Sequence, residues 1–377
     1  MVTQKVVLTN PLSFDGDSDV YQAPNLVRRI LSLFSNVRPG SDLTSFQIPP
    51  VFNIPKSHLQ CYGESVYCVS KDLLKKCNNG ENSLERFIGV VGWCISIPRP
   101  AIFGAAPYNP ILGETHHVSK GSLNVLLEQV SHHPPVSALH ATDENENIEI
   151  IWCQQAIPKF YGTKVEAEIR GKRELKLHKH GEKYVMNSPN LRIKLLPPGH
   201  DWVGNVKIKC EESGLEAELC FLTSSLFGRK ASHSINGRIY RSSSFNTTLY
   251  EIHGHWNSIV TVKDMMNNGK ERIIYDAKEV MSGLKSPLVK DPKGILASES
   301  AAVWSEVSEG ILTSNWEKAK EAKKNIEATQ REALKERNST GKNWLPKYFN
   351  LLYTKDGGWD CSPIHKLVPP APIIYPQ

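Results

Sequence analysis

The sequence has no run of apolar residues long enough to cross a bilayer. Its longest weakly polar stretch, residues 88–97, is about half of what a membrane-spanning helix needs. The N-terminal residues also lack the charged-then-apolar pattern of a secretory signal. We therefore expect a cytosolic protein whose contact with membranes is peripheral.

Cysteines are few and show no pairing rhythm. The chain has 8 cysteines in 377 residues and no C-x-x-C motif, which is typical of reduced thiols in an intracellular protein. It also lacks G-x-S-x-G, H-E-x-x-H, G-x-x-x-x-G-K-[ST] and dinucleotide-binding motifs. Although 13 histidines invite a metal site, no carboxylate stands at a fixed short spacing from them. These absences favour a protein that is not an enzyme and carries no metal or cofactor.

Basic residues outnumber acidic residues only slightly. The chain has 45 basic and 39 acidic residues, a formal net charge of +6. Such a balance suits an anionic membrane surface or a phosphorylated ligand, and it is too weak to indicate nucleic acid. The length suffices for one large domain or two ordinary ones.

Between residues 113 and 280 the apolar residues recur with a period of two. In residues 165–169, for example, Val165, Ala167 and Ile169 alternate with glutamates. Turn signals containing Gly, Pro and Asn separate such stretches at intervals of about ten residues. No helical crossover lies between them, so the strands are expected to pair antiparallel, in a sandwich or a barrel.

Helical patterns flank this β region. At the N-terminal side, apolar residues at i, i+4, i+7 and i+8 form one helical face, made by Leu26, Ile30, Leu33 and Phe34. This short amphipathic helix is either docked on the body or serves as a lid or membrane-surface element. Residues 300–337 are rich in Ala, Glu, Lys and Gln and predict helix, anchored by Trp304, Val307, Ile311 and Trp316. Residues 1–20 are expected to be disordered, and residues 355–377 to pack as extended chain on the surface.

The most informative segment is residues 128–138, Glu-Gln-Val-Ser-His-His-Pro-Pro-Val-Ser-Ala. Two adjacent imidazoles, His132 and His133, are followed by two residues with a locked φ and no N–H donor. The pair is therefore held stiffly at the end of the apolar strand 123–130. In extended backbone two successive side chains point to opposite faces of the strand. They can contact one ligand only where the chain kinks. A structural turn with one buried histidine is the plainer interpretation.

The unbroken string from Glu128 to Pro135 resembles the EQVSHHPP fingerprint of the oxysterol-binding protein-related family. The resemblance extends from near Leu26 to near Asn338, and two further segments share it. Residues 107–114, Pro-Tyr-Asn-Pro-Ile-Leu-Gly-Glu, resemble the K-P-x-N-P-x-L-G-E loop of the family. Residues 323–331 resemble its lysine–glutamate–arginine helix, although Lys323, Glu327 and Arg331 at i, i+4 and i+8 are also an ordinary salt-bridge ladder.

The resemblance implies a mainly β (α+β) fold: an incompletely closed antiparallel β-barrel with a lipid tunnel, an N-terminal helical lid and a C-terminal helical subdomain. It implies one domain at about residues 25–350, in the short form that consists of the ligand-binding domain only. Within it we expect a flexible N-terminus and lid in 1–50, a helical layer with the headgroup loop in 51–112, the barrel in 113–285, and the C-terminal subdomain and tail in 286–377.

The resemblance also implies roles for individual residues. The phosphates of phosphatidylinositol 4-phosphate would be clamped by four side chains, namely His132, His133, Lys323 and Arg331. Asn109 would donate from the loop, while Glu114 and Glu327 would orient the cations. The lipid tail would be covered by the lid side chains Leu26, Ile30, Leu33, Phe34, Leu43 and Phe46.

Two departures from the family pattern bear on the ligand. The position of the phosphate-contacting lysine is Ala106, and Arg99 is a candidate substitute from the same loop. Because a charged hydrogen bond contributes about 1.5–3 kcal/mol, its loss corresponds to roughly tenfold or more in affinity. Residues 97–103 depart from the polar pattern of sterol-transporting members, which bears on sterol selectivity more than on lipid binding.

These observations predict a cytoplasmic lipid-transfer protein that binds membranes peripherally, with endoplasmic reticulum or Golgi contact sites as candidate locations. Its partners would be membrane lipids: a phosphoinositide and, as a second ligand, a sterol or another lipid, with no role for nucleic acid. No acidic diphenylalanine motif that would indicate an endoplasmic reticulum tether is found. The alternatives are a phosphoinositide sensor or scaffold with little transport, and a lipid hydrolase with the histidines as general base.

Overall fold

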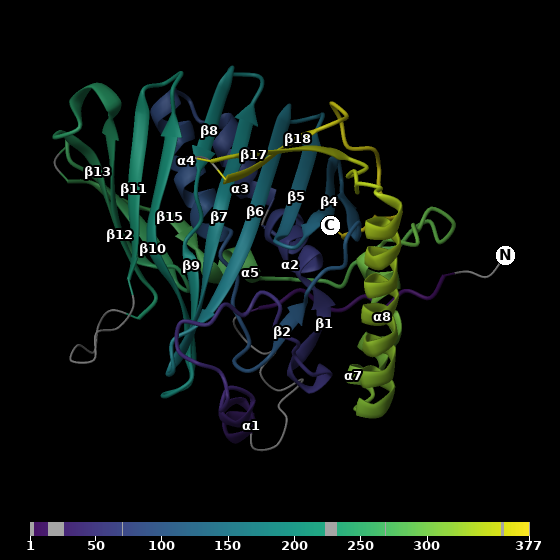
Figure 1. Cartoon of the computed structure of the whole chain (residues 1–377). Coiled ribbons are helices and arrows are strands. Elements are labelled where there is room, and N and C mark those ends of the chain that lie inside the picture. The colour runs from purple at the N-terminus through teal and green to yellow at the C-terminus, as the bar shows by residue number, and fades with distance from the viewer. Residues whose placement is uncertain are drawn as a thin grey trace.

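A computed structural model describes residues 4–13, 26–69, 71–222, 232–267, 269–355 and 358–376. Within these residues the dominant feature is one 15-stranded sheet (Figure 1). In sheet order its strands are β15 (Glu271–Asp276), β14 (Ile259–Asp264), β13 (Thr248–His255), β12 (Ser234–Arg241), β11 (Leu215–Leu222), β10 (Gly199–Cys210), β8 (Glu182–Met186), β7 (Lys164–Leu177), β6 (Ile148–Phe160), β5 (Pro135–Asp143), β4 (Leu123–His132), β3 (Thr115–Lys120), β19 (Ile373–Ile374) and β16 (Leu288–Val289), while β9 (Asn190–Lys194) pairs with β10 and β7.

The sheet is antiparallel except where β19 runs parallel to β3. Successive strands from β3 to β7 are neighbours joined by turns, as expected for a chain without helical crossovers. In the described part of the chain β15 and β16 form the two ends of the strand order and do not pair with each other. The expected class, mainly β with antiparallel pairing and helical segments on both sides, is confirmed.

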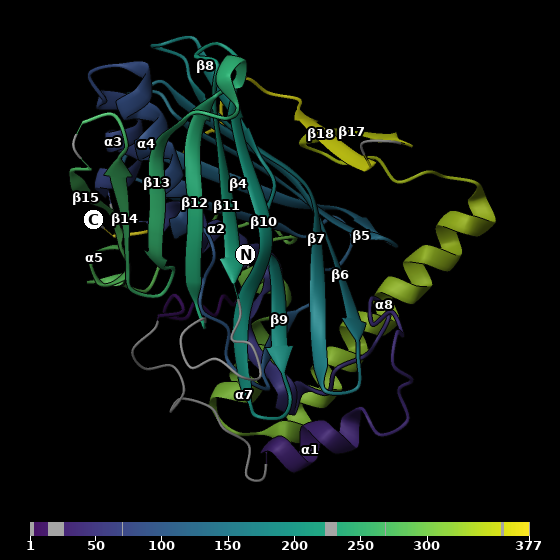
Figure 2. The ribbon, with the colours of Figure 1, turned by 90° about the vertical axis from the view of Figure 1, so that its left-hand side faces the viewer.

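Three helices pack against the concave face of the sheet: α2 (His58–Tyr67), α3 (Lys71–Asn79) and α4 (Ser83–Ser96) (Figures 1 and 2). Ser57 and Gln60 form a capping box at the start of α2, and Asn82 accepts two backbone N–H groups at the start of α4. The buried faces of these helices join the inner side chains of the strands in one large core. The three helices therefore cover part of the concave face of the sheet.

The C-terminal helical region is divided where the sequence predicts continuous helix. Its helices are α6 (Ser300–Val303), α7 (Ser305–Leu312) and α8 (Trp316–Thr340). The break before α8 contains Ser314 at φ 54° and Asn315, whose side chain accepts the N–H of Lys318. Gly310 permits α7 to approach α8, because a Cβ there would lie 2.7 Å from the Ala319 nitrogen. Trp304, Val307 and Ile311 are buried, as the expected anchors of this region.

The remaining elements are short. They comprise η1 (Pro50–Phe52), the parallel pair β1 (Asn53–Ser57) and β2 (Ala106–Tyr108), η2 (Ser242–Ser244), α5 (Ala277–Met281), the hairpin of β17 (Phe349–Thr354) and β18 (Gly358–Pro363), and α1 (Leu26–Leu33). The tail differs from the expected surface chain, because β19 joins the main sheet and Ile373 is fully buried. The α1 helix and the β17–β18 hairpin lie at opposite ends of the molecule (Figures 1 and 2).

Candidate functional site

The histidine pair lies at the hairpin that joins β4 to β5. A bulge between Gln129 and Ser131 interrupts the regular ladder just before it, and the His133–Pro134 peptide is cis. The two imidazole rings are 4.6 Å apart at 65°, so the chain kinks enough to bring neighbouring side chains to one place. His132 is half-buried and His133 is exposed. The two side chains therefore lie close enough together for one ligand to contact both.

A hydrogen bond sets the tautomer of His132. Its Nδ1 lies 3.0 Å from the carbonyl oxygen of Pro110, and because a carbonyl only accepts, Nδ1 must donate. Burial, and next the neighbouring His133, lower the pKa of His132, while the Pro110 carbonyl opposes this shift. The lowered pKa favours a neutral imidazole with an unprotonated Nε2, which must take up a proton before it can donate to a phosphate.

The loop of residues 106–114 carries the other predicted groups. Tyr108 is fully buried and stacks on Trp304 with ring centroids 4.5 Å apart, which fixes the loop on α7. Asn109 is exposed beside Pro110, the residue that contacts His132. The structure therefore brings Asn109 and the histidine pair together.

Glu114 has a different role from the predicted one. Its side chain is fully buried, and its carboxylate accepts hydrogen bonds from the hydroxyls of Ser57 and Ser300, the indole of Trp304 and the N–H of Ile111. Burial raises its pKa, and these four bonds oppose the shift. The expectation that Glu114 orients cations does not agree with these contacts, because every partner is neutral. The residue instead ties the loop to β1, α6 and α7.

Lys323 is the cation that reaches the loop from α8. Its ammonium nitrogen lies 2.6 Å from the carbonyl oxygen of Ile48 and 2.7 Å from Oδ1 of Asn53. The Nδ2 group of Asn53 in turn donates to the carbonyl oxygen of Ala106, at 3.0 Å. Burial lowers the pKa of Lys323 to about 8, partly opposed by Glu327. A chain of hydrogen bonds thus runs from α8 through Asn53 to the loop.

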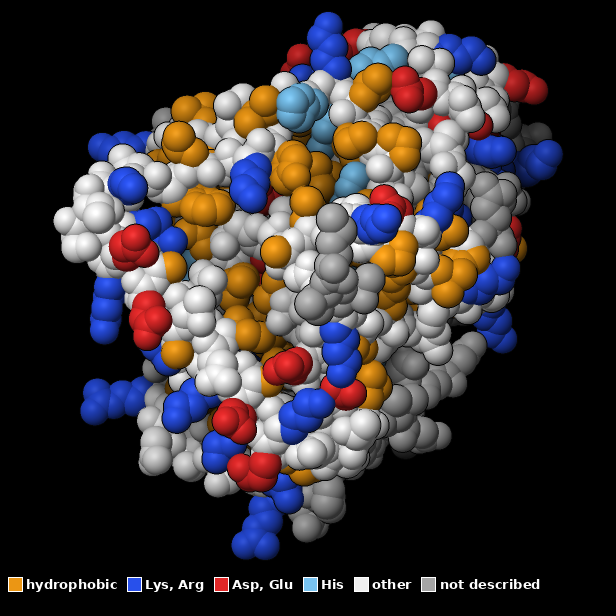
Figure 3. All heavy atoms as spheres, turned by 90° about the vertical axis from the view of Figure 1, so that its right-hand side faces the viewer, with side chains coloured by type: hydrophobic (Ala, Val, Ile, Leu, Met, Phe, Trp, Pro, Cys, Tyr) orange, Lys and Arg blue, Asp and Glu red, His pale blue; other side chains and the backbone are white. Residues whose placement is uncertain are grey.

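The other two charges of the helical stripe are less constrained. Glu327, one turn beyond Lys323, is half-buried, and Arg331 is exposed. Among the residues that the structure describes, Arg331 has no hydrogen-bond or ion-pair partner. The expected ladder on this helix is therefore absent between Glu327 and Arg331. Figure 3 shows the side of the molecule that carries α8, where hydrophobic side chains and histidines lie among lysines and arginines.

Sequence reasoning missed Asn53 and assigned no role to the carbonyl groups of Ile48 and Pro110. A backbone carbonyl carries no residue-type signal, and Asn53 follows Pro49-Pro50 without any motif. Arg99, the candidate substitute for the missing lysine, donates instead to the carbonyl oxygen of Glu64 and contacts Met281. Arg99 therefore does not replace the lysine for which this chain has Ala106.

The predicted lid side chains form a common apolar cluster. Leu26, Ile30, Leu33, Phe34, Leu43 and Phe46 pack there with Ile48, Phe52, Phe160, Val165 and Leu195. The ring of Phe34 stacks on that of Phe160 at 4.9 Å, and the N–H groups of Gly40 and Leu43 bond to the end of β6. We call this set the lid cluster. Ile48 belongs to it and also accepts the Lys323 hydrogen bond, so the lid cluster adjoins the cation.

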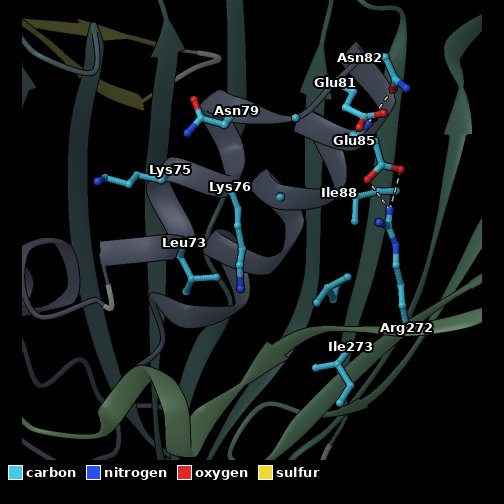
Figure 4. A pocket seen from close by; sticks show the side chains of 13 residues that line it. Leu73, Lys75, Lys76, Asn79, Glu81, Asn82, Glu85, Ile88, Arg272 and Ile273 are labelled. Carbon is cyan, nitrogen blue, oxygen red and sulfur yellow. Dashed lines mark hydrogen bonds and ion pairs between the residues drawn. The ribbon is translucent and has the colours of Figure 1, made fainter.

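A separate surface cavity lies between α3, α4 and β15 (Figure 4). It is lined by residues that include Lys76, Asn82, Glu85, Arg272 and Ile273, and Arg272 forms an ion pair with Glu85. None of the predicted site residues lines it. No helix of the described chain is both long and apolar enough to span a bilayer.

The family model described as oxysterol-binding protein matches residues 32–310. The chain belongs to the oxysterol-binding protein family. It is 52% identical over 376 residues to oxysterol-binding protein-related protein 4B of Arabidopsis thaliana, covering 98% of this chain and 97% of that protein. The related protein 4C of the same plant is 51% identical, with 98% and 99% covered. As a member of this family the protein is a lipid-binding protein and not an enzyme, which sets the hydrolase alternative aside.

Solved structures of the family share the fold. The Osh1 ORD domain in complex with cholesterol superposes with a TM-score of 0.78 at 19% identity, covering 96% of this chain and 90% of that one. The Osh3 ORD of Saccharomyces cerevisiae in complex with PI(4)P gives a TM-score of 0.69 at 21% identity, with 93% of both chains covered. At these identities the likeness supports the fold alone.

Proposed function

We propose that the protein is a lipid-transfer protein that extracts a phosphoinositide from one membrane and delivers it to another, at cytosolic membrane surfaces. The observation that carries this proposal is the continuity between the histidine pair, residues 106–110, Lys323 and the lid cluster. Polar groups for an anionic headgroup thus adjoin an apolar cover for its tail. The family relationship, with relatives that bind PI(4)P or a sterol, supports the same ligand class.

The proposed mechanism needs no chemical step. The phosphates are bound by four side chains, namely His132, His133, Lys323 and Arg331. Asn109 donates a hydrogen bond from the loop, and Glu327 favours the charged form of Lys323. The tail leaves water as the lid cluster closes over it, which stabilises the complex by about 25 cal/mol per Å² of buried apolar surface. A second lipid, either a sterol or another phospholipid, competes for the same interior. Exchange of one lipid for the other gives the transfer its direction.

Transfer between liposomes tests this function directly. Donor vesicles carry labelled phosphatidylinositol 4-phosphate, and the label is followed in acceptor vesicles after separation. Movement of unchanged lipid supports the carrier. Saturable binding without movement would leave a sensor or scaffold as the function, and absence of both would contradict the proposal.

Phosphoinositide affinity is expected to fall as the pH rises from 7.5 to 9.5. The bound phosphates favour the charged form of Lys323, whose pKa in the free protein is about 8, so binding requires a proton that is lost above this pH. Binding to vesicles at a series of pH values measures the slope. Lys323→Arg keeps its charge throughout this range and should flatten the slope. An equally steep fall in this variant would exclude Lys323 as the titrating group.

Ala106→Lys is expected to strengthen phosphoinositide binding by about tenfold, the equivalent of one charged hydrogen bond. Ala106 is half-buried on β2, and its carbonyl oxygen already accepts from Asn53. The dissociation constant for phosphoinositide vesicles measures the gain. Ala105→Lys, one residue earlier in the same loop, is the matched control for added charge. An equal gain in both variants would point to general attraction to the membrane.

A further inference from the structure

A cationic side chain lies inside the sheet, away from the headgroup groups. Arg173 is on β7, where it alternates with outward residues and shares its face with Leu175 and Leu177, both fully buried in the main core. Arg173 is itself only 7% exposed. Its guanidinium lies over the ring of Trp152, 4.5 Å from the centroid, and one amino group donates to Gln154 at 3.1 Å. The charge therefore points into the interior.

Most donors of this guanidinium have no acceptor. Within the described chain Nε and Nη1 of Arg173 are buried without a hydrogen-bond partner, as are the indole N–H groups of Trp152 and Trp93. No carboxylate of the described residues pairs with Arg173. Burial lowers the pKa of Arg173 to about 10, which still leaves it charged at neutral pH. An uncompensated buried charge destabilises a fold, so this group is better explained by a ligand than by stability.

The side chains of α2 that border this region have an unusual environment. His58 and Tyr62 retain accessible surface, yet burial lowers the pKa of His58 to about 4 and raises that of Tyr62 to about 12. Such shifts indicate that these two partly accessible side chains lie in a strongly desolvated environment. Tyr62 also interacts with Gln154 and Arg173, which places its phenol beside the guanidinium.

An apolar wall joins this region to the lid cluster. On the same face of β7 as Arg173 lie Ile169, Ala167 and Val165, all partly accessible, and Val165 belongs to the lid cluster. The eight steps from residue 165 to residue 173 span about 26 Å of extended strand. A long apolar body with one polar end at Arg173 therefore fits along this wall.

We propose that Arg173, with Gln154 and the indole of Trp152, forms a binding site for the carboxylate of an acidic amphiphile whose hydrocarbon body extends toward the lid cluster. A carboxylate offers acceptors only and pairs with a guanidinium through two parallel hydrogen bonds, so it satisfies the free donors and the charge together. A neutral hydroxyl would leave the charge uncompensated. The inference rests on the proposed function in one respect: the interior holds a lipid.

The test compares two fluorescent probes with the same conjugated polyene chain, one a fatty acid and the other the corresponding primary alcohol. At pH 7.5 the wild-type protein should bind the acid at least about tenfold more tightly, the value of one charged hydrogen bond. Arg173→Gln should bind the two probes equally and keep the wild-type affinity for the alcohol. The matched control, Arg170→Gln, removes an exposed arginine paired with Glu168 on the same strand and should keep the preference.

The outcomes separate this site from the function proposed above. Equal binding of acid and alcohol by the wild-type protein, or a preference that survives in Arg173→Gln, would overturn the carboxylate site while lipid binding stands. Binding of neither probe would contradict a lipid-holding interior altogether. Arg173→Lys keeps the charge and should retain part of the preference, so it decides the matter if the glutamine variant does not fold.

Discussion

Replacing His132 and His133 together by alanine is expected to reduce phosphoinositide extraction about 100-fold or more. In the proposed complex each imidazole is protonated and donates a charged hydrogen bond to phosphate, about 1.5–3 kcal/mol, and two such losses multiply in the binding constant. Among the described residues the His132 side chain hydrogen-bonds only to the Pro110 carbonyl, and His133 is exposed. The midpoint of thermal unfolding should therefore change by only a few degrees. Sedimentation of vesicles that contain phosphatidylinositol 4-phosphate measures the lipid removed.

The matched control replaces two other histidines, His253→Ala/His255→Ala. Both are exposed on β13, in a different part of the sheet from the β4–β5 hairpin. This variant should extract lipid as the wild type does. Extraction at the normal level by the His132/His133 variant would show that the pair does not hold the headgroup.

Glu114→Ala is expected to destabilise the protein by about 3–5 kcal/mol, the largest effect on stability that we predict. The substitution leaves buried donors from Ser57, Ser300, Trp304 and Ile111 without their acceptor, and each such group costs about 1–3 kcal/mol before the structure relaxes. Urea unfolding measures the free energy of unfolding. Lipid binding should be lost only where the chain unfolds.

Glu327→Ala is the comparison for this prediction. Glu327 is half-buried on α8, so its replacement should change the free energy of unfolding by no more than about 0.5 kcal/mol. A Glu114→Ala protein that is as stable as the wild type, yet binds no phosphoinositide, would restore the headgroup role to Glu114. The pair of variants thus separates a structural carboxylate from one that meets the ligand.

Much of the fold could be predicted because it depends on local pattern. The alternation in residues 165–169 predicts a strand, and these residues lie in the observed strand β7. The short turns between such stretches predict antiparallel neighbours, which β3 to β7 are. The helix expected over residues 300–337 was wrong in one respect, because the break at Ser314 and Asn315 depends on how α7 and α8 cross at Gly310.

The candidate site was predictable only in its residue types. The histidine string and the loop of residues 107–114 marked two segments that the structure places in contact. A motif does not distinguish a buried carboxylate with neutral partners from one beside a cation. Glu114 has the first environment, and it is set by Ser300 and Trp304, which are more than 180 residues away in sequence. Asn53, which links Lys323 to Ala106, carried no signal at all.

The sequence by itself determined the β-rich class, the antiparallel order of neighbouring strands and the family, since these follow from periodicity, turn residues and one unbroken motif. Only the tertiary structure decided that the rings of His132 and His133 lie 4.6 Å apart, that Lys323 has a lowered pKa, and that Arg173 is a charge enclosed by the sheet. The reason is physical. Burial and charge pairing depend on which distant segments meet, whereas the period of a strand depends on its own residues.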